Sequence, residues 1–242
     1  MADQLYLSLW FPNFRFEALP AALVSVLRQF TLISGKDNQR VAVATVYPIS
    51  FTEAPTYQRI FVNDKRAAET RDTEDSIIEN AVAEATEQLH DDLAYEFEMR
   101  WNLWTPDISP AASSEAQLDT LWRLEPRTVR IIGFGPNFDA AAYEQNGHIR
   151  IDFGLDTPWV LDTLEDDRLD ADRNADSDTY DETDPQLRHD EETTRRIQQN
   201  VEMLLAFTLS VEKNCGISSR LLWTESGEPL AEKLIARLQR LN

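Results

Sequence analysis

Leu9-Trp10-Phe11-Pro12 recurs as Leu103-Trp104-Thr105-Pro106, and each copy ends a strand-like run. Such self-similarity is the signature of an internal repeat. We therefore predict a duplicated strand-helix-strand-strand-helix unit, with a first repeat at 1–91 and a second at 92–242. The alternative is a chance resemblance between two stretches whose strands use the same few apolar residues. Shorter matches follow in the same order: Val41-Ala42-Val43 and Val129-Arg130-Ile131, Arg59-Ile60 and Arg150-Ile151, and Ile78 with Asn80 beside Ile197 with Asn200.

Hydrophobic periodicity predicts the strands and helices between these matches. Alternating apolar residues predict strands, and apolar residues three and four apart predict amphipathic helices. Together they predict an α+β two-layer sandwich in one domain, 1–242, whose mostly antiparallel sheet carries its helices on one face. The expected strands are 5–11, 41–47, 57–62, 93–104, 129–134, 148–153 and 221–223. The expected helices are 17–30, 72–89, 115–124, 193–213 and 229–241.

In the order of its elements, this chain resembles the duplicated strand-helix-strand-strand architecture of the GyrI-like ligand-binding domains. The resemblance is one of topology and rests on no diagnostic motif. It implies two units that close into one pseudo-twofold domain, and it carries no function with it, because one fold hosts many functions.

The charge of the chain limits the classes of partner that it is expected to bind. It has 43 acidic and 23 basic residues and a formal net charge of −20. Such a chain repels the phosphates of nucleic acids, which are bound through Lys and Arg, and it repels anionic membrane surfaces. We therefore expect no nucleic-acid or membrane partner and favour a basic protein partner. The sequence gives no indication of the oligomeric state.

Three further features favour the cytoplasm. The single cysteine, Cys215, cannot form an internal disulfide. Asp3 lies where a signal peptide would carry a basic residue. We also expect no membrane-spanning helix, on the interpretation that no apolar run approaches the roughly 18 residues that one requires.

An acidic insertion at 162–193 distinguishes the second repeat from the first. It contains 14 acidic residues against three arginines, which is more than half of the net charge of the protein. So few apolar residues cannot offset the entropy of ordering, so we expect a mobile, solvated loop. A calcium-loop interpretation that starts at Asp170 fails, because Ala175 replaces the required Gly and Asp181 the bidentate Glu. We predict no metal site and no cofactor.

The chain lacks the familiar catalytic motifs, and the best remaining group is His148, Asp152 and Asp156. On a strand His148 and Asp152 would share a face, and a His beside a carboxylate can act as a base or bind metal. The simpler interpretation is a polar strand face beside water.

The aromatic residues suggest one low-molecular-weight ligand site. Trp10 and Trp104 occupy equivalent places in the proposed repeat, so they could face each other across its axis, with Trp159 nearby. Paired aromatics in a negative protein suit a flat or cationic ligand. The alternative is that they are core residues that close strand ends.

These observations favour a non-enzymatic cytoplasmic binding protein that contacts a protein partner through the acidic loop or the sheet face. A small-molecule sensor or carrier that uses the seam between the repeats is the second hypothesis. An enzyme with a site near His148 and Asp152 is the third.

Overall fold

The structure is a computed structural model that describes residues 3–34, 43–48, 74–106, 122–138, 146–160 and 185–227; its side chains are described outside 43–48, 74–76 and 185–191. The predicted strand 57–62 and the predicted helix 229–241 lie outside these residues. The strands are β1 (Gln4–Trp10), β2 (Val43–Pro48), β3 (Leu93–Pro106), β4 (Trp122–Phe134), β5 (Ile149–Leu155) and β6 (Ser219–Thr224). The helices are the short 3-10 helix η1 (Phe16–Ala18) and the α-helices α1 (Leu19–Ser34), α2 (Glu74–Ala85) and α5 (Pro185–Asn214).

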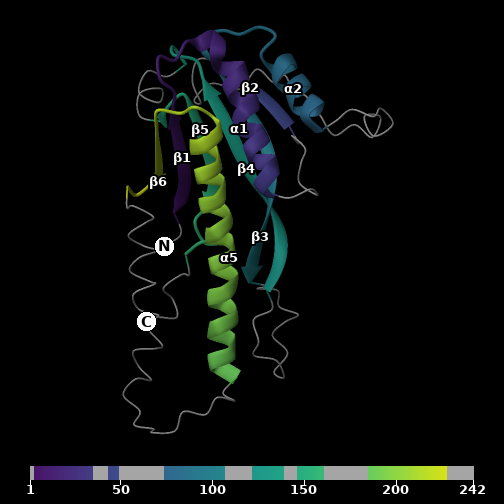
Figure 1. Cartoon of the computed structure of the whole chain (residues 1–242), viewed down its shortest axis with the longest axis vertical. Coiled ribbons are helices and arrows are strands. Elements are labelled where there is room, and N and C mark those ends of the chain that lie inside the picture. Colours follow the sequence, from purple (N-terminus) through teal and green to yellow (C-terminus); the bar gives the residue numbers. More distant parts are fainter. Residues whose placement is uncertain are drawn as a thin grey trace, which may run out of the picture.

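The described strands form one six-stranded antiparallel sheet in the order β2-β3-β4-β5-β1-β6. Helix α1 packs against both α2 and α5, all three helices contact the sheet, and α5 runs along the long axis of the molecule (Figure 1). The predicted α+β class, with an antiparallel sheet and helices on one face, is therefore confirmed.

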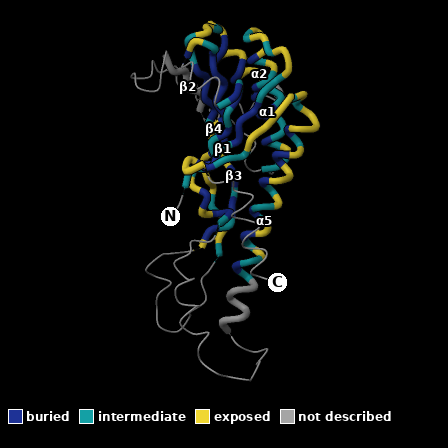
Figure 2. Tube along the Cα trace, turned by 90° about the vertical axis from the view of Figure 1, so that its left-hand side faces the viewer, coloured by how far each residue is buried: buried dark blue, intermediate teal, exposed yellow. Residues whose placement is uncertain are grey.

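The core lies between the sheet and the helices. A Cβ added to Gly133 of β4 would lie 2.8 Å from Leu19 and 3.1 Å from Leu23, so α1 packs directly on the middle of the sheet. Below this contact, Trp101 is surrounded by aromatic rings at centroid distances of 5.4 to 6.3 Å. Figure 2 shows the buried residues along the strands and the inner sides of the helices. The rings around Trp101 are Phe30, Phe153, Trp159 and Phe207.

The expectation of no long apolar run was wrong. Phe16–Ser34 is an apolar helical stretch of 19 residues, and by length and composition alone it would suffice to cross a membrane. Its buried residues belong to the same core cluster as residues of β1, β3, β4 and β5. Packing against the sheet therefore accounts for the apolar composition of this helix. These buried residues are Leu19, Leu23, Val26, Leu27 and Phe30.

Two predicted boundaries were also wrong. Trp122 and Leu124, assigned to a helix at 115–124, begin β4, where Leu124 pairs with Trp104. Pairing along the long β3–β4 hairpin overrides the local helical spacing. The acidic insertion ends earlier than predicted, because α5 starts at Pro185 and not at Thr193. Proline is tolerated in the first turn, where its missing N–H costs no hydrogen bond. Residues 161–184 lie outside the described residues, so the mobility of the loop stays a prediction.

The described strands do not show the predicted duplication. Within the second repeat β3 pairs with β4, whereas in the first repeat β1 pairs with β5 and β6, and β2 pairs with β3. The division at residue 91 stays a prediction. The two Trp motifs do end their strands, as expected. However, β1 and β3 run in opposite directions, so Trp10 and Trp104 lie at opposite ends of the sheet.

Candidate functional site

Two rows of side chains cross the sheet on the face opposite the helices. Because Gly133 faces α1, its neighbours Arg130 and Ile132 point to the other face. In the strand register, each of these two residues of β4 lies level with one residue on each of β3, β5, β1 and β6. The first row is Trp223, Tyr6, Asp152, Arg130 and Glu98; the second is Leu221, Ser8, Arg150, Ile132 and Glu96. We call these ten residues the sheet-face rows.

One end of the sheet-face rows is aromatic. The rings of Tyr6 and Trp223 pack with centroids 4.6 Å apart, and Trp223 Nε1 donates a hydrogen bond of 3.0 Å to Ser8 Oγ. The Arg150 guanidinium lies 5.2 Å from the Tyr6 ring centroid and 5.3 Å from that of Phe134, within the range of cation–π attraction. Burial, with the charge of Asp152, raises the pKa of the Tyr6 hydroxyl, so this end stays uncharged at Tyr6.

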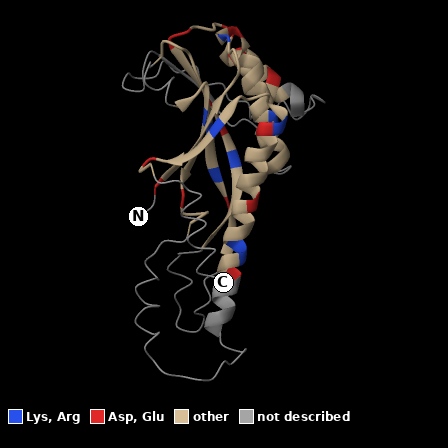
Figure 3. Cartoon of the chain, turned by 60° about the vertical axis from the view of Figure 1, so that its left-hand side comes forward, with Lys and Arg blue, Asp and Glu red and all other residues tan. Residues whose placement is uncertain are grey.

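The other end is charged. Arg130 lies between two carboxylates, with Nε 3.9 Å from Glu96 and Nη1 3.9 Å from Asp152. Its side chain is 49% exposed, against 7% for Glu96 and 16% for Asp152. These are ion pairs without the short geometry of a hydrogen bond. Figure 3 shows basic residues along the strands of the sheet, and in the rows Arg130 and Arg150 lie among the carboxylates of Glu96, Glu98 and Asp152.

Accessibility within the rows differs from strand to strand. Ile132 is only 2% exposed, because it belongs to a small second core cluster with Ala94, Phe134 and Phe138. Leu221 on β6 is 51% exposed. Ser8 on β1 is fully buried, so a partner would reach the rows from the β6 edge and through Arg130.

The predicted ligand-site tryptophans do not come together as one site. Trp104 and Trp159 converge on the fully buried Asn200 of α5, whereas Trp10 lies at the far end of the sheet. The Trp104 N–H donates to Asn200 Oδ1 at 3.0 Å, and Asn200 Nδ2 donates to the carbonyls of Trp104 (2.9 Å) and Pro158 (2.8 Å). Trp159 Nε1 donates to the Asn200 carbonyl at 3.2 Å.

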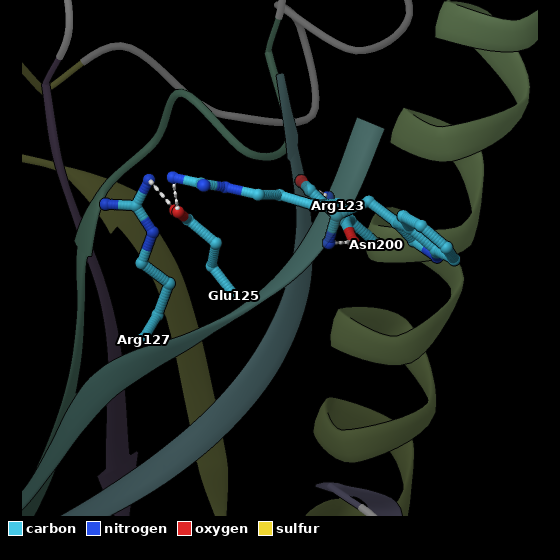
Figure 4. A network of polar contacts seen from close by, with 5 residues as sticks. Arg123, Glu125, Arg127 and Asn200 are labelled. Atoms are coloured by element: carbon cyan, nitrogen blue, oxygen red, sulfur yellow. Dashed lines mark hydrogen bonds and ion pairs between the residues drawn. The ribbon is translucent and has the colours of Figure 1, made fainter. Parts of the chain in front are cut away.

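The Asn200 side chain provides the hydrogen bonds that a neighbouring strand would provide at this edge of β3. Among the described residues, β2 pairs with β3 as far as Glu98, and farther along the same strand the Asn200 amide binds both backbone groups of Trp104 (Figure 4). A buried strand edge must find such partners, because unpaired backbone groups are costly. Sequence reasoning missed this role. The signal was a single Asn in the apolar stripe that contains Ile197 and Leu204, since a polar residue in such a stripe is buried with a partner.

Arg196 covers the outer side of this cluster. Its guanidinium lies 3.7 Å from the Trp104 ring centroid, and its Nε lies 2.6 Å from Glu192 Oε1. We expect Arg196→Ala to lower the free energy of unfolding by about 1 kcal/mol, through loss of the cation–π contact and of a partly exposed ion pair. Arg195→Ala, whose side chain is 68% exposed, should change it by less than about 0.5 kcal/mol. Urea denaturation measures both variants, and equal effects would contradict the stacking role.

A separate charged group lies on the first half of β4, which pairs with β3 alone. Glu125 forms ion pairs with Arg123 and with Arg127 (Figure 4). The Thr105 side chain and these two guanidinium groups hold the pKa of the Glu125 carboxyl below its usual range. All three charges are at least 30% exposed, so the group is a surface ion-pair network.

The candidate catalytic residues have separate structural partners. His148 Nδ1 accepts a hydrogen bond of 3.0 Å from the Phe11 N–H. Asp152 accepts one of 2.9 Å from the Gly154 N–H, and Asp156 accepts one of 2.9 Å from the Asp3 N–H. Among the described residues no group of three or more His, Cys, Asp or Glu side chains could hold a metal ion. The bonds of His148 and Asp156 join the ends of β5 to those of β1, that of Asp152 is local to β5, and none of these bonds joins one candidate to another.

Comparisons with protein-family models, curated proteins and solved structures found no match to this chain. Its function must therefore be argued from its own residues.

Proposed function

We propose that this chain is a non-enzymatic binding protein that contacts a protein partner through the sheet-face rows. The observation that carries the proposal is the alignment of Trp223, Tyr6, Asp152, Arg130 and Glu98 across five strands on the face opposite the helices.

The composition of the rows supports a protein interface. Trp, Tyr and Arg are the residues that most often carry the binding energy of such interfaces. Here the packed rings of Tyr6 and Trp223, with the half-exposed Leu221, provide an apolar centre beside a charged border at Arg130. An apolar centre with a polar rim is the usual anatomy of a protein–protein contact.

Charge supports a basic partner. With a net charge of −20, the chain attracts positive proteins over long range. Asp152 and Glu98 belong to the first row and the buried Glu96 to the second, so three carboxylates lie on this face. Arg130 is held only loosely between two of them, so a basic partner group can replace it. Such attraction speeds association more than it tightens binding, and salt weakens it.

The small-molecule hypothesis has weaker support. It requires Trp10 and Trp104 to line one site, and the strand directions place them at opposite ends of the sheet. Trp159 is fully buried and its indole N–H is bonded to Asn200.

Site-specific photo-crosslinking tests the proposal. A benzophenone amino acid at Leu221, on the sheet-face rows, should form a discrete adduct with a basic protein in an extract of the source cells. The same group at Leu32, which is 72% exposed on α1, is the matched control and should form none. The Trp223→Ala substitution should remove the Leu221 adduct, and higher salt should weaken it. Identical adducts from both positions, or none from Leu221, would refute an interface on this face.

A further inference from the structure

His148 joins two segments that lie far apart in the sequence. It directly precedes β5, and its Nδ1 accepts the Phe11 N–H from the connection between β1 and η1, residues 11–15. Its backbone N–H donates to the Leu9 carbonyl at 2.9 Å, and its carbonyl accepts from the Phe134 N–H at 3.1 Å. The backbone bonds fix the position of His148 in the sheet. The side-chain bond reaches the connection.

Aromatic stacking strengthens the same contact. The Phe14 ring lies on the imidazole with centroids 4.2 Å apart and planes inclined by 12°, and the Phe11 ring lies 6.2 Å away. Between them, Asn13 has a φ of 48°, a left-handed conformation that few non-glycine residues adopt. The connection thus turns sharply so that both phenylalanines meet the imidazole.

The hydrogen bond requires a neutral ring. An Nδ1 that accepts carries no proton, so the single ring proton is on Nε2. Protonation of the imidazole would turn Nδ1 into a donor that faces another donor, the Phe11 N–H. The bond would then be lost, and the charged ring would be poorly solvated in its half-buried place.

We propose that His148 is an acid-sensitive latch, whose protonation releases residues 11–15 from the start of β5 and exposes Phe11 and Phe14. This inference is independent of the proposed function, because it concerns the end of the sheet where β5 begins and needs no partner.

Burial lowers the pKa of His148 below its ordinary value of 6.5. The charged groups on the two joined segments are Arg15 on the connection and Arg150 and Asp152 on β5. A lowered pKa means that the unfolded chain takes up the proton first as the pH falls. The stabilisation by the latch is therefore complete above about pH 6.5, declines as the pH falls through that value, and is gone below the folded-state pKa.

Nuclear magnetic resonance tests the latch on the intact protein. Nitrogen shifts of the imidazole should report the Nε2–H tautomer and a pKa below that of an exposed histidine. Hydrogen exchange of the Phe11 amide, corrected for its intrinsic pH dependence, should lose protection in step with His148 protonation. A Phe11 amide that stays protected after His148 has titrated would overturn the proposal.

Two variants separate the latch from general acid sensitivity. His148→Asn places an amide oxygen near the position of Nδ1, so it can still accept the Phe11 N–H but does not titrate. Its Phe11 amide should stay protected at the acidic pH that releases the wild type. His90→Asn is the matched control, because His90 is exposed and should release Phe11 as the wild type does. If His148→Asn releases Phe11 at the same pH as the wild type, the proposal fails. Should this variant not fold, the wild-type titration decides alone.

Discussion

Asn200→Ala is expected to lower the free energy of unfolding by about 3–5 kcal/mol, as measured by urea denaturation followed through tryptophan fluorescence. The substitution removes the partners of three backbone groups: the N–H and carbonyl of Trp104 and the carbonyl of Pro158. Each buried polar group left without a partner costs about 1–3 kcal/mol. Partial relaxation toward water at this sheet edge keeps the total below the sum of the three. The bond from Trp159 to the Asn200 carbonyl belongs to the backbone and survives.

Two further variants locate the origin of this loss. Asn200→Asp keeps an acceptor for the Trp104 N–H but offers no donor to the two carbonyls and buries a charge, so it should be no more stable than the alanine variant. Gln198→Ala removes an exposed side chain two residues away, whose amide binds Glu202, and should cost less than about 0.5 kcal/mol. A loss below about 1 kcal/mol for Asn200→Ala would show that the edge of β3 does not depend on this amide.

The element types were predictable wherever one periodicity extends over a whole segment. Leu19, Leu23, Val26 and Phe30 recur at helical spacing, and all four are buried in α1. The partners of each strand were not predictable in this way. β1 pairs with residues around 150 and 222, and nothing in its alternation of polar and apolar residues specifies either partner. The proposed repeat was the only basis for predicting these partners, and the observed neighbours of β1 and β3 do not show a repeat.

In the candidate site, too, residue types were predictable from the local sequence, whereas their long-range contacts were not. Composition singled out Trp104 and Trp159, but their convergence depends on Asn200, which approaches from a helix 96 residues beyond Trp104 in the sequence. Likewise, His148 stood out as a titratable residue, whereas its partner at Phe11 lies 137 residues earlier. Residue type therefore identifies candidates, and only the fold decides whether a polar group meets solvent, a reactant or a backbone amide.

Gly147→Ala is the second variant for which we expect a large effect, a loss of about 3 kcal/mol or more in the free energy of unfolding. Gly147 has a φ of 81°, and an added Cβ would lie 2.6 Å from the carbonyl oxygen and 3.0 Å from the nitrogen of Leu9. Both atoms belong to the backbone of β1, so no side-chain rotation can relieve the contact. The strand would have to move away, which weakens the hydrogen bond from the His148 N–H to the Leu9 carbonyl.

Gly154→Ala separates the two causes of this loss. Gly154 has a nearly identical φ of 78°, but no atom lies within 4 Å of its added Cβ. Its substitution should therefore cost only the left-handed backbone conformation, about 1–2 kcal/mol. The difference between the two variants measures how closely β1 approaches the residue before His148. Equal losses in urea denaturation would mean that backbone conformation alone requires glycine at 147. They would also mean that β1 can shift there without penalty, in which case the junction that positions His148 beside Phe11 is looser than the hydrogen bonds indicate.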